Sequence, residues 1–249
     1  MQPAMKSNQI AALAAIACAM GALASPLAFS QSATSPSIPV GTLTASPTLV
    51  LTGTKPTLRW NITYPASVVA YISISPTGTI TPNQNLIADV RVLGAGVTTQ
   101  NSNGSINYIR TMGQIRYNGA SSWTPIFDGK NTDTIVQQQG IIKTFSVTAN
   151  QPMNFAGNYY YNNTWSTLYS SLSGEHVRTL VNGNTPPSNI PDYNAPSLES
   201  FIKPYLDASG KVRIGPMDVI IFMELTHTNK ADIGYDVQDL VLLITFRTP

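Results

Sequence analysis

Val219-Ile-Ile-Phe-Met-Glu-Leu225 and Asp239-Leu-Val-Leu-Leu-Ile-Thr-Phe246 are two strongly apolar runs near the end of the chain. Both have the length of a β-strand and are rich in β-branched and aromatic residues, which favour strands. An unbroken apolar run is typical of a strand covered on both faces, whereas a half-exposed strand alternates. The sequence therefore predicts two central strands, joined by the polar segment 226–238.

Earlier segments alternate in the manner of half-buried strands. In 57–63, Leu58, Trp60 and Ile62 alternate with polar residues. Further strands are expected at 68–74, 87–93, 106–110, 114–117, 134–137 and 141–147. This spacing predicts an all-β fold, a mostly antiparallel β-sandwich of the immunoglobulin or jelly-roll kind, over residues 41–249. A sub-boundary near residue 100 is the alternative organisation.

Residues 154–193 have the least regular pattern of the chain, with a long loop after residue 182. One short helix is expected near 197–203. Its signals are the cap residue Ser197 and a following apolar face that includes Leu198 and Phe201.

Residues 1–30 have the pattern of a removable signal peptide. A positive n-region precedes the apolar stretch 10–24, and small residues allow cleavage before Ser25 or Gln31. A transmembrane anchor is the alternative, but the stretch is rich in Ala and ends in a polar run. Residues 31–40 form a Ser/Pro linker. We expect a protein that is secreted, periplasmic or on the cell surface, without a membrane span after cleavage.

Composition narrows the chemistry further. Cys18 is the one cysteine and lies in the expected signal peptide, so the processed protein has no disulfide and no thiolate metal site. Charged residues make up 10% of the chain, against about 25% in a typical soluble protein. The net charge is +2 with no basic cluster, which argues against nucleic acid as a partner.

Two resemblances add to this description. The ending Phe222-Met-Glu-Leu225, then Asp232-x-Gly-Tyr-Asp236-x-Gln-Asp239-Leu-Val-Leu, resembles that of a domain-of-unknown-function family in exported and surface bacterial proteins. That family ends on an acidic hairpin of the form Asp-x-Asp-(Tyr/Phe)-Asn-Asp-hydrophobic. The strand around Trp60 is similar to early strands of immunoglobulin-like sandwiches. The resemblances imply a bacterial, exported β-sandwich protein.

The acidic residues of the C-terminal hairpin are candidates for a metal site. Glu224, Asp232, Asp236 and Asp239 gather around one loop in a chain with few charges. Carboxylate and carbonyl oxygens are the ligands that Ca²⁺ prefers, so these four residues predict a calcium site that stabilises the hairpin. The alternative is that the acids cap turns, accept backbone N–H bonds, or pair with cations of the chain.

Exposed aromatic residues are candidates for a carbohydrate-binding surface. Tyr159, Tyr160, Tyr161 and Trp165 lie close together in the sequence, and Trp123 precedes a strand-like run. Three consecutive tyrosines cannot all face the core of a half-covered strand, so we expect at least one to be exposed. Packing in the core or anchoring of a loop is the alternative for each of them.

Catalytic motifs are lacking: the sequence has no Gly-x-Ser-x-Gly elbow, no His-Glu-x-x-His array and no phosphate-binding glycine loop. A glycosidase using a Glu or Asp pair stays open, because such pairs are distant in sequence. The sequence therefore predicts a non-catalytic surface or extracellular-matrix protein that associates with other copies of itself or with surface polysaccharide. A carbohydrate-binding module is the first alternative, and a glycoside-active enzyme the second.

Overall fold

The computed structural model describes residues 40–46, 57–63, 66–173, 176–186, 201–232 and 234–249, the first two ranges by their backbone. The expected signal peptide and linker, up to residue 39, lie outside the described residues. So do residues 187–200, which include most of the helix expected near 197–203.

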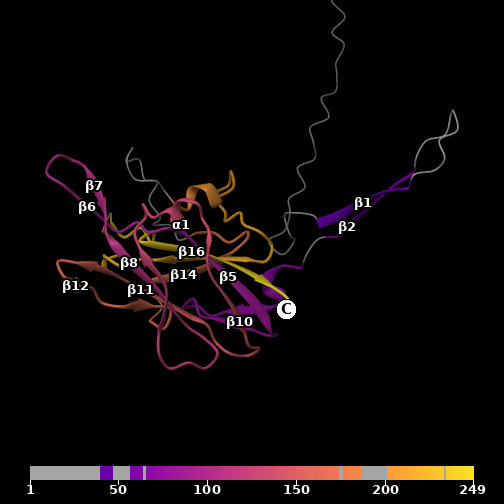
Figure 1. Cartoon of the computed structure of the whole chain (residues 1–249), viewed down its shortest axis with the longest axis horizontal. Coiled ribbons are helices and arrows are strands. Elements are labelled where there is room, and N and C mark those ends of the chain that lie inside the picture. The colour runs from indigo at the N-terminus through magenta and orange to yellow at the C-terminus, as the bar shows by residue number, and fades with distance from the viewer. Residues whose placement is uncertain (1–39, 47–56, 64–65, 174–175, 187–200, 233) are drawn as a thin grey trace, which may run out of the picture. The chain divides into compact units, whose positions relative to one another are not determined.

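Two antiparallel sheets form the body of the fold, and several of their strands, among them β5, β16, β8 and β11, are labelled in Figure 1. The C-terminal sheet has the strand order β10-β5-β16-β15-β14. The β8–β11 sheet has the order β12-β11-β8-β9, and β13 pairs with β11 as well. The bounds are β5 (Leu86–Gly94), β8 (Arg110–Arg116), β9 (Thr124–Gly129), β10 (Ile141–Val147), β11 (Asn154–Tyr161), β12 (Thr164–Trp165), β13 (Tyr169–Ser170), β14 (Val177–Val181), β15 (Asp218–Met223) and β16 (Leu240–Arg247).

Shorter elements complete the described part of the chain. Paired strands are β1 (Val40–Ser46) with β2 (Thr57–Thr63), β3 (Ile72–Ile74) with β4 (Ile80–Pro82), and β6 (Thr98–Gln100) with β7 (Ile106–Tyr108). Helical turns are η1 (Val68–Ala70), α1 (Thr134–Gln137) and η2 (Lys203–Tyr205).

A shared apolar core joins the two sheets. Val90 and Leu242 of the C-terminal sheet and Ile115 and Phe155 of the β8–β11 sheet are buried in one cluster. Burial of each such side chain contributes about 1.5–3 kcal/mol relative to exposure. The all-β, mostly antiparallel, sandwich-like fold expected from the sequence is confirmed.

The outer face of the C-terminal sheet is covered too. Phe222 of β15 and Val241 of β16 pack in a second cluster with Ile202, Ile214 and Val237. The prediction of two central strands covered on both faces is therefore confirmed.

The segment 134–137 is helical, so the strand expected there is wrong. Asp133 stands at the N-terminal cap of α1, and its carboxylate accepts the N–H of Lys130. Ile135 is exposed while Val136 is buried. Two adjacent apolar residues fit either a strand or one helical turn, and the polar turn before them favoured the helix. The segment 68–74 is likewise strand only in its last part, after η1.

The segment 154–193, which looks irregular in the sequence, contributes the strand β11 to the β8–β11 sheet. β11 pairs with β8 along one edge and with β12 and β13 along the other. The sequence hides it because Gly157 and Asn158 interrupt the apolar pattern. Residues on both sides of position 100 share the C-terminal sheet, because β5 pairs with β10 and β16.

Among the described residues, no helix has both the length and the apolar character needed to cross a membrane.

Candidate functional site

The strand β8 divides its side chains cleanly between the core and the outside. Thr111, Gly113 and Ile115 are buried, and the residues between them are exposed or partly exposed. Successive strand residues face opposite sides, so Arg110 and Arg116 lie on the same outer face. Polar and aromatic groups gather on that face.

Two aromatic rings stand beside Arg110. Tyr160 of β11 is the register partner of Arg110 on one side and of Trp165 on the other, so all three side chains share the outer face. The rings of Tyr160 and Trp165 lie 5.2 Å apart, centroid to centroid, at 57°. The guanidinium carbon of Arg110 lies 5.3 Å from the Trp165 ring centroid and 5.8 Å from that of Tyr160. These distances are those of cation–π contacts.

A carboxylate from the neighbouring strand holds Arg110 in place. Arg110 donates through Nε to Oδ1 of Asp128 and through Nη2 to Oδ2, each at 2.6 Å. This bidentate bond lowers the pKa of Asp128 and raises that of Arg110. Both side chains reach solvent, with 48% and 34% of their surface exposed. We call Arg110, Asp128, Tyr160 and Trp165 the Arg110 platform.

Asn158 lies next to the platform, two residues before Tyr160 on the same face of β11. Its side-chain oxygen is buried and accepts no hydrogen bond from the described residues. Its amide donates weakly to the Ser166 carbonyl, at 3.5 Å. Because this oxygen is shielded from solvent, it lies beneath the platform surface and is not itself a contact point for a ligand.

The other predicted aromatic residues go to different places. Tyr159 packs against the core, and burial raises its pKa. Tyr161 is 45% exposed but alternates away from the platform face. Trp123 lies just before β9, with the Arg116 guanidinium 5.4 Å from its ring centroid. Of the five residues, the structure thus brings Tyr160 and Trp165 together.

Sequence reasoning missed Arg110 and Asp128. They are far apart in the sequence, and neither belongs to a motif. The signal that could have found them is charge: they are exposed charged residues in strands of a chain that has few.

The predicted metal residues lie at the other feature of interest, the Glu224 loop (residues 224–239, apart from Ile233). Glu224 is fully buried. Its Oε1 accepts the N–H groups of Thr226 and His227 and the Thr226 hydroxyl, at 2.8–3.1 Å. Its Oε2 accepts the N–H groups of Asp236 and Val237, at 3.0 and 3.1 Å. The Glu224 carboxylate is thus hydrogen-bonded to the backbone near both ends of the loop.

Val237 shows how strongly this carboxylate shapes the chain. Its φ is +54°, a left-handed conformation that is unfavourable for a β-branched residue. Successive N–H groups near such a residue point together and form an anion-binding nest. Here the anion is the Glu224 side chain, which offsets the strain.

The remaining acids differ in burial. Asp239 is buried and accepts the Leu225 N–H at 2.7 Å, and burial together with the nearby Glu224 carboxylate raises its pKa well above the ordinary value. Burial likewise raises the pKa of Asp236 to about 6. Asp232 is exposed, with Oδ1 3.9 Å from the Nε2 of His227.

The structure therefore brings Glu224, Asp236 and Asp239 together and leaves Asp232 at the edge. Within the described ranges, no three His, Cys, Asp or Glu side chains are arranged to hold a metal ion. The bonds seen at Glu224 and Asp239 are those of the alternative role, in which acids accept backbone N–H groups. The calcium site stays a prediction.

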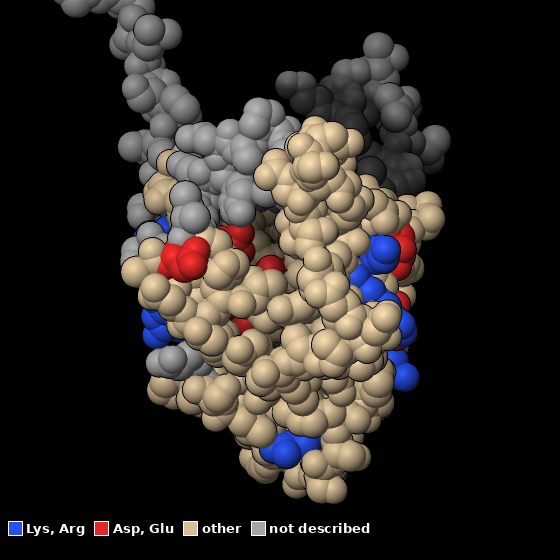
Figure 2. Space-filling view, turned by 90° about the vertical axis from the view of Figure 1, so that its left-hand side faces the viewer, with Lys and Arg blue, Asp and Glu red and all other residues tan. Residues whose placement is uncertain are grey.

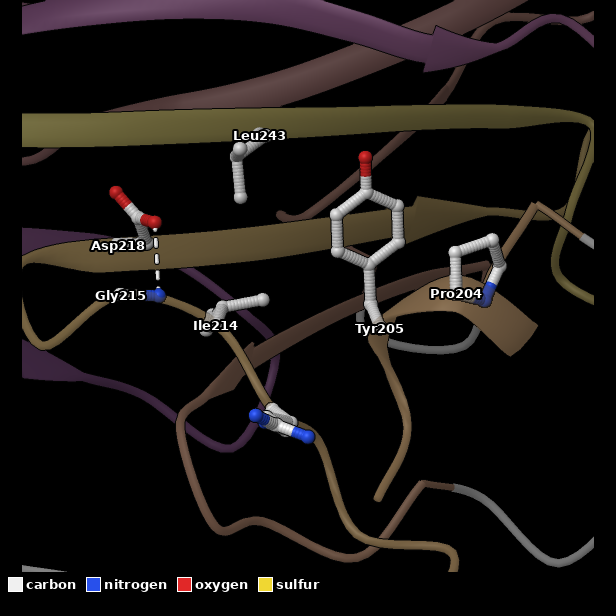
Figure 3. Close-up of a pocket in the computed structure, with 7 residues that line it drawn as sticks. Pro204, Tyr205, Ile214, Gly215, Asp218 and Leu243 are labelled. Carbon is white, nitrogen blue, oxygen red and sulfur yellow. Dashed lines mark hydrogen bonds between the residues drawn. The ribbon is translucent and has the colours of Figure 1, made fainter. Parts of the chain in front are cut away.

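A separate cavity of about 300 Å³ lies against the outer face of the C-terminal sheet (Figure 3). Its lining residues are Pro204, Tyr205, Arg213, Ile214, Gly215, Asp218 and Leu243. Figure 3 shows the Asp218 carboxylate bonded to the Gly215 N–H, at 2.9 Å. Asp218 also accepts the Thr245 hydroxyl, and Tyr205 donates to Gln139. The Asp218 carboxylate and the Tyr205 hydroxyl are therefore already hydrogen-bonded to other residues of the chain.

Charged groups are sparse on the visible surface. Figure 2 shows small, separate groups of acidic and basic residues on a face that is mostly uncharged. This agrees with the low charge content of the sequence and argues against a ligand held by a broad electrostatic field.

Comparison of the chain with family models, with curated proteins and with solved structures found no match.

Proposed function

We propose that this protein is an exported, non-catalytic surface or matrix protein that binds neutral carbohydrate through the Arg110 platform. The observation that carries the proposal is the contact of Arg110 with two aromatic rings while Asp128 holds its guanidinium from the other side.

The platform offers the two kinds of contact that a sugar ring needs. The C–H face of a sugar is apolar and packs on aromatic rings, and Tyr160 and Trp165 supply two such rings, both partly exposed. Sugar hydroxyls both donate and accept hydrogen bonds. The Asp128 oxygens can accept from them, and the Arg110 guanidinium can donate to them.

Charge balance favours a neutral ligand. The positive charge of Arg110 is paired with Asp128 at 2.6 Å. An anionic sugar would have to compete with Asp128 for the guanidinium, whereas a neutral sugar can use both groups as they stand. The same pairing disfavours the phosphates of nucleic acid.

The chemistry of the platform favours binding over hydrolysis. Glycosidases use two carboxyl groups, one of them protonated near neutral pH. The platform has one carboxylate, and its hydrogen bonds from Arg110 lower its pKa, which keeps it ionised. The sequence has three glutamates: Glu175 and Glu199 lie outside the described residues, and Glu224 is bound by backbone N–H groups.

A glycan array containing neutral and acidic glycans tests the proposal. We expect the full chain after signal removal to bind a subset of neutral glycans, and Tyr160→Ala and Trp165→Ala to lose at least tenfold in affinity. Tyr161→Ala is the matched control, because it removes an exposed tyrosine one residue away that faces elsewhere, and we expect it to bind normally. Absence of any glycan signal at high protein concentration would overturn the proposal.

A further inference from the structure

We infer that the ligand is a linear chain of several sugar rings lying along β8, from the Arg110 platform to a second contact at Arg116 and Trp123. This inference rests on the proposed carbohydrate binding and extends it from one contact to a strand-long site.

The second contact repeats the first in simpler form. The Arg116 guanidinium lies 5.4 Å from the Trp123 ring centroid, and both side chains are partly exposed. We call this pair the Trp123 site. Each end of the β8–β9 pair thus presents an arginine of β8 beside an aromatic ring.

Both contacts lie on one face of the sheet. The burial of β8 alternates without interruption from Arg110 to Arg116, so the two arginines point to the same side. They are separated by six strand steps of about 3.3 Å, or roughly 20 Å. A single sugar ring cannot span this distance, but a chain of several rings can.

A β-bulge in β9 lets both Asp128 and Trp123 lie beside the arginines on the outer face of β8. The register of β8 with β9 shifts between Gly113 and Gln114: Met112 pairs with Asp128, but Gln114 pairs with Pro125. The extra residue lets both Pro125 and Asp128 face outward, although they are three positions apart, an odd offset that places two residues on opposite faces of a regular strand. The bulge thus aims Asp128 at Arg110 while Trp123 stays near Arg116.

The surface between the two contacts is uncharged. Met112 and Gln114 of β8 are partly exposed, and Pro125 of β9 is exposed beside them. These side chains offer a neutral chain apolar contact and an amide, and none of the three carries a charge that would have to be desolvated. A continuous ligand is therefore favoured over two separate small ones, because its second contact forms at a high effective concentration once the first is made.

The test is a series of neutral β-1,4-linked glucose, mannose and xylose oligomers of one to six rings, measured by calorimetric titration with the full chain after signal removal. For the sugar that binds, we expect affinity to rise at least tenfold between the short and the long oligomers. Trp123→Ala should lose this gain, and Trp123→Phe, which keeps a ring, should retain most of it. Tyr161→Ala is again the control and should behave as the unmodified chain.

The outcomes separate the inference from the proposed function. If oligomers bind in a Trp165-dependent manner but affinity does not depend on length or on Trp123, the extended site is wrong and the platform stands. If Trp123→Ala and Trp123→Phe lose the gain equally, the aromatic contact is wrong. If no oligomer or array glycan binds, both the inference and the proposed function fail.

Discussion

The Arg110 platform and the Glu224 loop are both built around a carboxylate, but they use it in opposite ways. At the platform, Asp128 and Arg110 stay partly exposed and neutralise each other across two strands. In the loop, Glu224 is buried and accepts five hydrogen bonds from its own chain. A polar cluster that satisfies itself stabilises the fold, whereas one that keeps solvent access stays available to a ligand.

The largest expected effect is on the buried carboxylate. Glu224→Ala leaves the N–H groups of Thr226, His227, Asp236 and Val237 without their acceptor in a buried site. We expect the free energy of unfolding to fall by roughly 3–5 kcal/mol in a urea titration. Asp232→Ala, at the exposed edge of the same loop, should change it by less than about 0.5 kcal/mol. Equal losses in the two variants would contradict the role given to Glu224.

The pH dependence of stability sharpens the same contrast. Burial raises the pKa of Asp236 from 3.8 to about 6, so the folded chain holds a proton there that the unfolded chain has released. The resulting stabilisation is present below pH 3.8 and is lost as the pH rises through 6, by up to about 3 kcal/mol. Asp236→Asn should reduce this fall when unfolding is measured between pH 4 and pH 7. The prediction is contradicted if the stability of the unmodified chain rises between pH 4 and pH 7 and Asp236→Asn gives the same profile.

The calcium prediction concerns the same loop. If Ca²⁺ binds the folded hairpin, the chain gains about 2.7 kcal/mol of stability at a concentration one hundred times the dissociation constant. The melting temperature should then rise with added Ca²⁺ and fall with a chelator, and Asp232→Ala and Asp236→Ala should weaken the response. A melt that is the same in both conditions would remove the calcium site.

The smallest expected effect on stability is at the platform. Exposed ion pairs add little to stability, so Arg110→Ala and Asp128→Ala should each shift the melting temperature by no more than about 2 °C. The same variants should lower glycan affinity clearly. If the variants are much less stable but bind glycan normally, the Arg110–Asp128 pair stabilises the fold, as Glu224 does, and does not contact the ligand.

Much of the fold could be predicted because its main strands keep a clear periodicity. The run 141–147 matches β10, and the runs ending at 225 and 246 match β15 and β16 to within two residues. The prediction fails where a signal is short or broken. Ile135 and Val136 fit a strand or one helical turn equally well, and Gly157 and Asn158 hide β11 within an apparent loop.

The site was less predictable because it depends on register. The sequence singled out Tyr160 and Trp165, which are close in the chain and meet across a tight turn. It could not place Arg110 or Asp128 beside them, because that contact needs β11 to pair with β8, and β8 with a bulged β9. Nor could it show that the Glu224 carboxylate would be taken up by the backbone of its own loop.

The central claim is that the Arg110 platform binds neutral carbohydrate. It is tested most directly by calorimetric titration of the strongest glycan found on the array into the unmodified chain, Trp165→Ala and Tyr161→Ala. We predict that Trp165→Ala loses at least tenfold in affinity with an unchanged melting temperature, while Tyr161→Ala binds as the unmodified chain does. Equal affinity for all three proteins would contradict the claim.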